Sequence, residues 1–528
     1  MMKQRKYAAA AALMGLFVMT NALPTSACTA VYVGADASAD GTIMLARCND
    51  YPAVWPNYVT VYNRVEGEPG RTMPVDEAQT VFADLPETTY QYTATPWMDS
   101  MQAVTGHMSD CAACVNEYGV SMTMSVTAFA NEASLEADPR PSNGLTEDTA
   151  NDLVICQSRT AREAVEVLCG LIDTYGSAES NIALISDQTE AWYVEMYTGH
   201  QYAAVLLPSD KVAVFGNEFG LEYLSDYEDS IASPELLSLA EEHGFAVFND
   251  EGEMNLLKTY SADYFDYSHM RTWIGHQLLA PSGYGDYQHD DVYPLVFSAD
   301  DKVSLQDVME LMRNRYEGTE YSPDETDRPD VRVIGTDTTL SAHILQTYPD
   351  LPAEIACVTW ESVGPDLYGV FVPVSNGCTS ISESYSRNQT AEEAGNFDSE
   401  NYPWYAFKEL CTLCLTDYQV YGEPVRAYWK EAEAGMIQGM SQVLETAASM
   451  GDTTLEIPII TDYCAMLQEQ AFSDAKSLLN DVIWYMSENS NTFKVGINPE
   501  THEQTDELKT YAPLEVGLDA SAYAVVPN

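Results

Sequence analysis

One cysteine stands at the junction of two dissimilar stretches. Small residues end at Thr25-Ser26-Ala27, Cys28 follows, and Thr29 to Val33 has the composition of a β-strand. Cleavage between Ala27 and Cys28 would leave a thiol and a free α-amino group on the same residue. Such a residue holds both a nucleophile and a base, because the amine, with a reference pKa of about 7.7–8.0, can take the proton of the attacking thiol. This chemistry needs no histidine.

Residues 1–27 have the features of a secretory signal peptide. Lys3, Arg5 and Lys6 form a positively charged start, Tyr7 to Met19 is apolar, and small residues precede the cleavage point. The apolar stretch is shorter than the roughly 20 residues of a membrane span. The sequence therefore predicts an extracytoplasmic protein, either secreted or retained in the cell envelope.

A lipoprotein leader is the competing interpretation of the same junction. Bacterial lipoproteins are also cut just before a cysteine, which then carries lipid and cannot act as a nucleophile. Thr25, preceded by Pro24, occupies the place where an aliphatic residue is usual, and this weakens the match. If Cys28 is lipidated, the chain is a membrane-anchored, non-catalytic surface protein. Otherwise no membrane association is expected.

Composition excludes some partners. The 528 residues are 46% hydrophobic, as in a globular protein, and carry a net charge of −57 from 81 acidic and 24 basic side chains. Such a charge repels nucleic acids and anionic membranes. The acidic residues are dispersed, which indicates a solvated surface. Homo-oligomerisation is left open.

The cysteine count is odd. Of 11 cysteines, ten remain without Cys28, enough for up to five disulfides of unknown connectivity. Two C-x-x-C pairs occur, Cys111/Cys114 and Cys411/Cys414, far apart and without histidines at zinc-finger spacing. In an oxidising compartment this pattern favours disulfides or buried thiols over zinc. We expect no cofactor and no metal.

The residues after Cys28 predict a β-hairpin. A strand to Val33, a turn at Asp40-Gly41 and a returning strand from Thr42 to Arg47 would bring the second strand back beside Cys28. Arg47 and Asp50 should then lie near the thiol. Taken alone, the same pattern also fits an ordinary hairpin with exposed charges.

The remaining chain indicates strands, then helices, then strands. Residues 146–175 have helical periodicity, and strand candidates follow at 181–185, 190–196 and 211–215, with later β-rich runs at 355–360 and 368–374. Hairpin-length links favour antiparallel sheets with helices packed outside them. After about residue 390, long helix-compatible stretches predict a helical C-terminal extension, at residues 404–418, 424–449 and 462–489.

Several motifs together resemble one known family. Cys28-Thr29-Ala30 after a removable leader, with Ala46 to Asp50 some twenty residues on, is similar to the dipeptidase A family of cysteine peptidases. These belong to the N-terminal nucleophile (Ntn) hydrolases, with penicillin V acylases and bile salt hydrolases. Further matches follow in the family's order and extend the resemblance over about residues 28–490, at Asn116 to Val120, Ala191 to Glu195, Lys211 to Asn217 and Met270 to Trp273.

The resemblance implies an Ntn-hydrolase αββα four-layer sandwich, with residues 28–390 as catalytic domain and 391–528 as helical extension. It also implies hydrolysis of dipeptides or short peptides. Cys28 would be the nucleophile and its amine the base, Asp50 would orient that amine, and Arg47 would favour the thiolate. Asn217 matches an oxyanion-stabilising asparagine, and Arg271 a second arginine of the site. Each residue also has a purely structural alternative. Arg47, Asp50 and Arg271 could form ion pairs that hold loops together, and Asn217 could be an ordinary turn residue at the end of a strand.

Some features depart from the family or leave alternatives open. Cys48 stands where the family often has asparagine, and a thiol so near could pair with Cys28. A further oxyanion asparagine has no counterpart around Ser125–Thr127. His107, His200, His269 and His343 lie in no recognisable catalytic signature, and no G-x-S-x-G elbow occurs. A related Ntn amidase acting on N-acyl amino acids or conjugates is the alternative enzyme.

Overall fold

The structure, a computed structural model, describes most of the chain. The described residues are 28–51, 54–105, 111–124, 127–326, 328, 330–489, 495–498, 500–508 and 511–526. The predicted leader, residues 1–27, lies outside them, as do His107, Ser125 and Val126.

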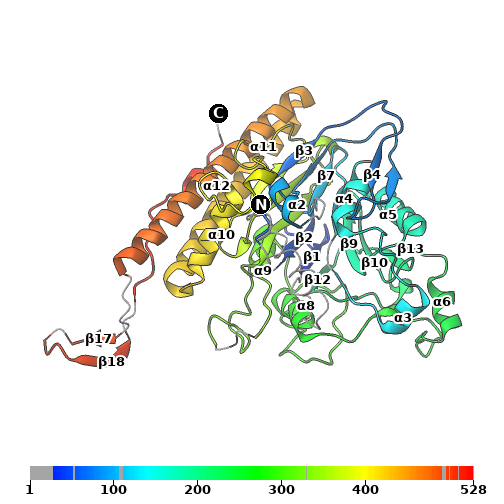
Figure 1. Ribbon diagram of the computed structural model, residues 1–528, viewed down its shortest axis with the longest axis horizontal. Helices are drawn as coiled ribbons and strands as arrows, with labels where there is room; N and C mark the ends of the chain where they lie inside the picture. Colours follow the sequence, from blue (N-terminus) through cyan, green and yellow to red (C-terminus); the bar gives the residue numbers. More distant parts are fainter. Residues whose placement is uncertain are drawn as a thin grey trace, which may run out of the picture.

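A six-stranded antiparallel sheet holds the segment that follows Cys28 (Figure 1). Its β1–β2 hairpin is the one predicted from the sequence, and Gly41 in the connection has a φ of 78°, which glycine adopts without steric cost. Ala30 pairs with Arg47, so the end of β2 returns beside Cys28. In sheet order, the strands are β12 (Val212–Phe215), β1 (Ala30–Val33), β2 (Ile43–Asp50), β14 (Thr339–Thr347), β15 (Cys357–Val363) and β16 (Val372–Ser375).

A second antiparallel sheet has eight strands, and α4 and α5 pack against it. In sheet order, its strands are β13 (Ser230–Ala232), β11 (Tyr202–Leu206), β10 (Ala191–Met196), β9 (Asn181–Ser186), β8 (Ser121–Met124), β7 (Cys114–Asn116), β6 (Tyr92–Ala94) and β3 (Thr60–Tyr62). Two small two-stranded sheets are formed by β4 (Thr72–Pro74) with β5 (Phe82–Asp84) and by β17 (Val495–Ile497) with β18 (Gln504–Leu508).

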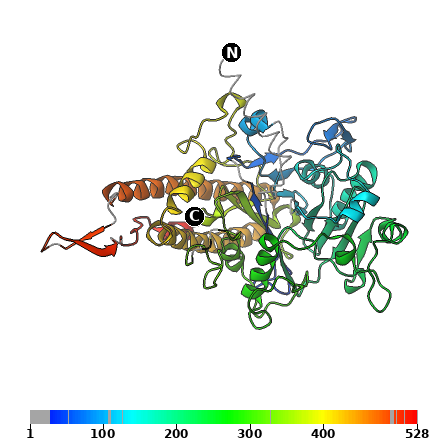
Figure 2. The same ribbon diagram turned by 60° about the horizontal axis from the view of Figure 1, so that its bottom comes forward.

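Helices flank both sheets, and α10, α11 and α12 run together along one side of the molecule (Figures 1 and 2). The β17–β18 hairpin stands out from the body beyond α12 (Figure 2). The α-helices are α2 (Asp99–Thr105), α3 (Glu132–Ala137), α4 (Glu147–Ile155), α5 (Ala161–Tyr175), α6 (Leu236–His243), α7 (Leu256–Tyr260), α8 (Asp266–Leu279), α9 (Leu305–Met312), α10 (Pro403–Cys414), α11 (Glu423–Met450) and α12 (Thr453–Asn489). Short helical turns are η1 (Leu224–Asp226), η2 (Ala353–Ile355), η3 (Asp366–Tyr368), η4 (Ala391–Glu393), η5 (Tyr418–Gly422) and η6 (Ala520–Ala524).

Alternation along the strands divides the apolar residues among three cores. Successive side chains of a strand point to opposite faces. On β1, Ala30 and Tyr32 therefore join a core shared with the second sheet, while Val31 and Val33 join a core shared with α8, α9 and the C-terminal helices. The third core lies between the second sheet and α4 and α5. Cys28 belongs to the core shared by the two sheets, which places the thiol between them.

A buried ion pair attaches α11 to the rest of the protein. Arg313, just after α9, donates to both carboxylate oxygens of Glu433 on α11, at 2.9 and 2.5 Å. The Phe371 amide also donates to Glu433, at 2.9 Å. Removing one partner of such a buried pair would leave the other charge uncompensated, so α11 is held in one position on the protein.

The predicted class of antiparallel sheets with helices outside them is confirmed at this level. The strands at 181–185 and 190–196 form the adjacent pair β9 and β10, whereas 211–215 contributes β12 to the other sheet. Among the strands that were not predicted are β11 and β14, which lie inside the two sheets. The third C-terminal helix begins at Thr453, earlier than expected, because the chain stays helical through Pro458.

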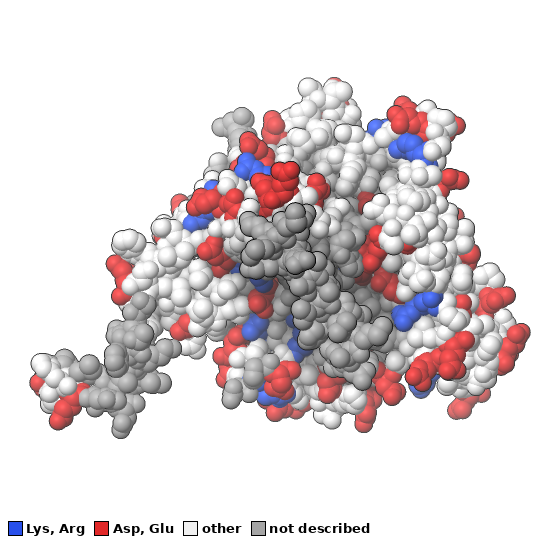
Figure 3. All heavy atoms as spheres, viewed as in Figure 1, with Lys and Arg blue, Asp and Glu red and all other residues white. Residues whose placement is uncertain are grey.

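The visible surface carries dispersed acidic residues with few basic ones between them (Figure 3). This matches the solvated acidic surface expected from composition. Within the described part of the chain, no helix combines the length and the apolarity needed to cross a membrane.

Candidate active site

Cys28 is buried two residues before β1, and one arginine contacts its sulfur. Burial raises the pKa of the thiol in the uncut chain to about 11, and the charge of Arg47 acts in the opposite direction. Nη1 of Arg47 lies 3.8 Å from Sγ of Cys28. The arginine predicted to assist the thiol is therefore in contact with it.

Arg47 is held from its other side by the loop before β7. Its Nη2 donates to the carbonyl oxygen of Ala112 at 3.4 Å, and the Thr123 hydroxyl donates to the same oxygen at 3.3 Å. Arg47 itself is fully buried in β2, opposite His343 of β14. A buried cation fixed beside a thiol favours the thiolate form.

Asp50 ends β2 and is bonded through both carboxylate oxygens. Oδ1 accepts a hydrogen bond from the Thr339 hydroxyl at 2.6 Å. Oδ2 accepts from Nη2 of Arg332 at 2.8 Å and from the Cys48 thiol at 3.1 Å. Arg332 and Thr339 were missed from the sequence, because nothing near either residue marks it as a partner of β2.

Cys48 is oriented toward Asp50. Its Sγ accepts a hydrogen bond from the Thr29 amide at 3.1 Å and donates to Asp50. Cys48 packs in the core on the helix side of its sheet, whereas Cys28 packs in the core between the sheets. The pairing of Cys28 with Cys48 that the sequence left open is therefore opposed by the fold, because the two side chains leave the sheet on opposite faces.

Arg271 joins the backbone of Cys28 to Asn217. From α8, its Nη1 donates to the Cys28 carbonyl oxygen and, at 2.9 Å, to the Thr29 hydroxyl. Its Nη2 donates to Oδ1 of Asn217 at 2.8 Å. A Cβ at Gly216 would lie 2.6 Å from the Ser268 carbonyl oxygen, so glycine allows the end of β12 to approach α8 this closely.

The amide nitrogen of Asn217 is engaged elsewhere. Its Nδ2 donates to the Thr127 carbonyl oxygen at 2.8 Å. The structure therefore places Asn217 against Arg271. The amide donor of Asn217 is bonded to Thr127, in the segment around Ser125–Thr127 where the sequence lacks a second oxyanion asparagine.

A buried glutamate near the thiol was also missed. Glu147 begins α4 and is 5% exposed, and its charge is among the influences that raise the pKa of Cys28. Its carboxylate accepts from the Tyr51 hydroxyl at 3.3 Å and from Nδ2 of Asn181 at 3.0 Å, and its amide donates to Glu179 at 2.5 Å. No described Lys, Arg or His forms an ion pair with it.

The histidines have other partners. Nε2 of His343 lies 2.8 Å from the Thr123 hydroxyl, and burial and the charge of Arg47 lower the pKa of the ring well below its ordinary value. His269 bonds to Glu218, and the half-exposed His200 bonds to Asp138. None of these three histidines is bonded to the Cys28 thiol, so these positions do not support a catalytic cysteine–histidine pair.

One cluster among the described residues has the donors for a metal ion, and two of its members flank Ala112 in the loop that holds Arg47. It combines Cys111, Cys114 and Asp152. The second C-x-x-C pair, Cys411 and Cys414, is buried on α10 without such a third donor in the described part of the chain.

Comparison with known proteins adds to this geometry. Residues 27–431 match the model of peptidase family C69. "Probable dipeptidase B" of Streptococcus pyogenes serotype M1 is 31% identical over 381 residues, covering 69% of this chain and 75% of that protein. "Probable dipeptidase" of Latilactobacillus sakei is 30% identical over 395 residues, covering 70% and 78%.

A solved structure, that of a mutant conjugated bile acid hydrolase from Clostridium perfringens, aligns over 69% of this chain and 95% of that one. Its identity is 8% and its TM-score 0.31, values that carry no inference about function. The family match and the relatives confirm the resemblance expected from the sequence: the chain belongs to peptidase family C69 and is a cysteine-type peptide hydrolase.

Proposed function

We propose that this chain is an exported dipeptidase whose nucleophile, Cys28, becomes N-terminal when the leader is removed after Ala27. In this proposal the two sheets and their flanking helices form the αββα sandwich of Ntn hydrolases over residues 28–390. Residues 391–528 form the helical extension. The substrates are dipeptides and other short peptides.

The observation that carries the proposal is the contact of Arg47 with Cys28, next to the bonded carboxylate of Asp50. Nη1 of Arg47 lies 3.8 Å from the sulfur, and Asp50 lies on the same strand three residues later. A cation stabilises the thiolate, and a carboxylate can accept a hydrogen bond from the adjacent ammonium. The two charges thus suit the two halves of an N-terminal cysteine.

Acylation transfers one proton. The α-amine of Cys28 takes the thiol proton, directly or through water, and the sulfur attacks the peptide carbonyl carbon, giving a tetrahedral oxyanion. As the C–N bond breaks, the ammonium returns the proton to the departing amino acid, and a thioester remains on Cys28. Asp50 orients the amine throughout.

Deacylation repeats the sequence with water. The amine takes a proton from water, and the hydroxide oxygen attacks the thioester carbonyl. The collapsing intermediate releases the second amino acid, and the proton returns to the sulfur. The amide of Asn217 is the proposed oxyanion donor, for which it must exchange its bond to the Thr127 carbonyl for the oxyanion. Loss of one such donor costs roughly 2.7–4 kcal/mol of transition-state stabilisation.

Glu147 supports dipeptides over the alternative substrates. A dipeptide brings a free ammonium close to the scissile carbonyl, and desolvating that charge requires an anion nearby. Asp50 is already paired with Arg332, whereas Glu147 has no cationic partner among the described residues. An N-acyl amino acid lacks this ammonium, so the amidase alternative leaves the charge of Glu147 uncompensated.

The primary test is the mass of the mature N-terminus together with the activity of a nucleophile variant. A chain beginning at unmodified Cys28 that hydrolyses dipeptides, and loses this activity in C28A, supports the proposal. C169S removes a buried thiol on α5 and is the matched control. A lipid adduct on Cys28 supports the anchored surface protein instead. Activity retained in C28A, or hydrolysis of N-acyl amides but not of dipeptides, overturns the proposal.

A further inference from the structure

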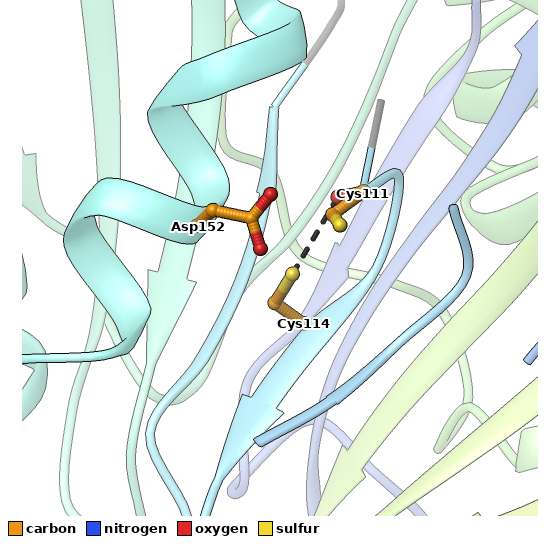
Figure 4. Close-up of side chains that lie close together, drawn as sticks. All are labelled: Cys111, Cys114 and Asp152. Atoms are coloured by element: carbon orange, nitrogen blue, oxygen red, sulfur yellow. Dashed lines mark hydrogen bonds between the residues drawn. The ribbon is translucent and has the colours of Figure 1, made fainter. Parts of the chain in front are cut away.

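Two thiols from the loop that supports Arg47 converge with one carboxylate (Figure 4). The sulfur atoms of Cys111 and Cys114 and a carboxylate oxygen of Asp152 all lie within 4.8 Å of one another. Cys114 begins β7, Cys111 precedes it in the loop, and Asp152 faces them from α4. The third donor therefore comes from a separate element that the C-x-x-C spacing alone could not indicate.

Neighbouring groups orient these donors. The Tyr92 hydroxyl donates to Oδ1 of Asp152 at 2.6 Å. Nδ2 of Asn151 donates to the Cys111 carbonyl oxygen at 2.8 Å, and the Cys114 thiol donates to the same oxygen at 3.5 Å. Such outer contacts are typical of metal sites, where they fix the ligands before the ion binds.

The surroundings make a cation favourable. Cys111 and Cys114 are 1% and 0% exposed and pack among apolar residues of the third core. The pKa of the Cys111 thiol is raised first by its hydrogen bond with Cys114 and then by burial. Burial also raises the pKa of Asp152. Two buried thiols beside a half-buried carboxylate would retain their protons unless a cation compensated their charge.

In contrast to the absence of metal expected from the sequence, we propose that Cys111, Cys114 and Asp152 bind a zinc ion that stabilises the loop before β7. Thiolates with a carboxylate suit Zn²⁺ and disfavour Ca²⁺ and Mg²⁺, which prefer oxygen ligands. Binding exchanges the two thiol protons, and any proton on Asp152, for the ion. With three protein ligands, the fourth position of a tetrahedral ion is left for water.

The metal site would affect catalysis only by positioning Arg47. Ala112 lies between the two cysteines, and its carbonyl oxygen accepts the hydrogen bond from Nη2 of Arg47. An ion that clamps Cys111 and Cys114 would therefore fix the acceptor that orients Arg47 against Cys28. Removing the ion should loosen Arg47 without removing any group that touches substrate.

The test is metal analysis of the full-length protein, purified without chelator and without metal-affinity resin. We expect about one zinc ion per chain. C111S and C114S should lose it, and Y92F should bind it roughly tenfold more weakly because Asp152 is less well oriented. C414S, in the C-x-x-C pair on α10, is the matched control and should keep its zinc.

A measurement on the unaltered chain tests the proposal even if the cysteine variants fail to fold. After zinc removal, titration with Co²⁺ should produce a thiolate-to-cobalt charge-transfer band that saturates at about one equivalent. Absence of both zinc and this band overturns the proposal. A Cys111–Cys114 disulfide, detected as the loss of two hydrogens within the single tryptic peptide that contains both cysteines and located by fragmentation under non-reducing conditions, also overturns it, because the thiolates are then unavailable.

Discussion

Arg332 and Asp50 lie 282 positions apart in the sequence, yet Nη2 of the arginine is 2.8 Å from Oδ2 of the carboxylate. Asp50 is also the group proposed to orient the amine of Cys28. The charge of Asp50 is therefore already partly neutralised by Arg332 before leader cleavage frees the amine of Cys28. The strength with which it holds the ammonium depends on a residue from a distant loop.

Replacing Arg332 should shift the pH dependence of hydrolysis. In R332Q the full charge of Asp50 acts on the ammonium and raises the pKa of the amine by about one unit. Since the neutral amine is the base, the ascending limb of kcat/KM should move to higher pH and activity at pH 7 should fall. R328Q, on an exposed arginine paired with Asp330, is the control. An unshifted limb would show that Arg332 does not influence the amine.

Replacing Arg47 should make the thiol less reactive. Burial raises the pKa of Cys28 and Arg47 opposes this effect, so R47Q should raise the thiol pKa further. A rise of one unit corresponds to about 1.4 kcal/mol and lowers the thiolate fraction roughly tenfold. The rate of iodoacetamide labelling of Cys28 between pH 6 and 10, located by peptide mass, measures it. R64Q is the surface control, and an equal labelling profile in both variants would contradict the role of Arg47.

Glu147 should determine the affinity for substrates with a free ammonium. In E147Q we expect KM for dipeptides to rise roughly 10- to 100-fold with little change in kcat, because a charge-assisted contact of about 1.5–3 kcal/mol is lost. N-acetylated dipeptides lack this ammonium and should be poor substrates of the unaltered enzyme. In E147Q the preference for free dipeptides over N-acetylated ones should be smaller. E166Q on α5 changes an exposed glutamate and is the control. Unchanged KM in E147Q would remove Glu147 from substrate binding.

Asp366 should make stability depend on pH. Its carboxylate is fully buried, neither oxygen accepts a hydrogen bond from a described residue, and burial raises its pKa to about 7. A carboxyl group whose pKa is higher in the folded state weakens folding as pH rises, here from about pH 4 to pH 7. D366N should therefore increase the free energy of unfolding at pH 8 by a few kcal/mol, at about 1.4 kcal/mol per unit of pKa.

The control for this prediction is the pH series itself. At pH 4 the unaltered protein and D366N should have similar free energies of unfolding, because Asp366 is then protonated in the folded state. Urea titrations at both values measure the difference. An identical pH dependence in the two proteins would show that Asp366 is not the group responsible.

Local patterns predicted the part of the site that is local. The β1–β2 hairpin follows from strand-forming residues on either side of Asp40-Gly41, and the hairpin alone brings Arg47 back to Cys28. Asn217 and Arg271 came instead from the family resemblance, and the structure connects them through a hydrogen bond that their spacing does not imply.

Partners contributed by distant segments were not predictable in this way. β14 pairs with β2 and presents Thr339 to Asp50, but a single buried strand has no periodicity that identifies its neighbour. The same holds for Glu147 at the start of α4 and for Asp152 further along the same helix, whose proximity to Cys28 and Cys111 depends on how α4 packs on the second sheet.

The sequence by itself thus indicated the family through its ordered motifs, and it determined the hairpin that brings Arg47 to Cys28, because turn chemistry and side-chain alternation act over a few residues. Only the tertiary structure decided which charges surround that residue, which face of the sheet Cys48 occupies and which carboxylate joins Cys111 and Cys114. These relationships arise from packing between segments hundreds of residues apart, and local sequence does not encode such contacts.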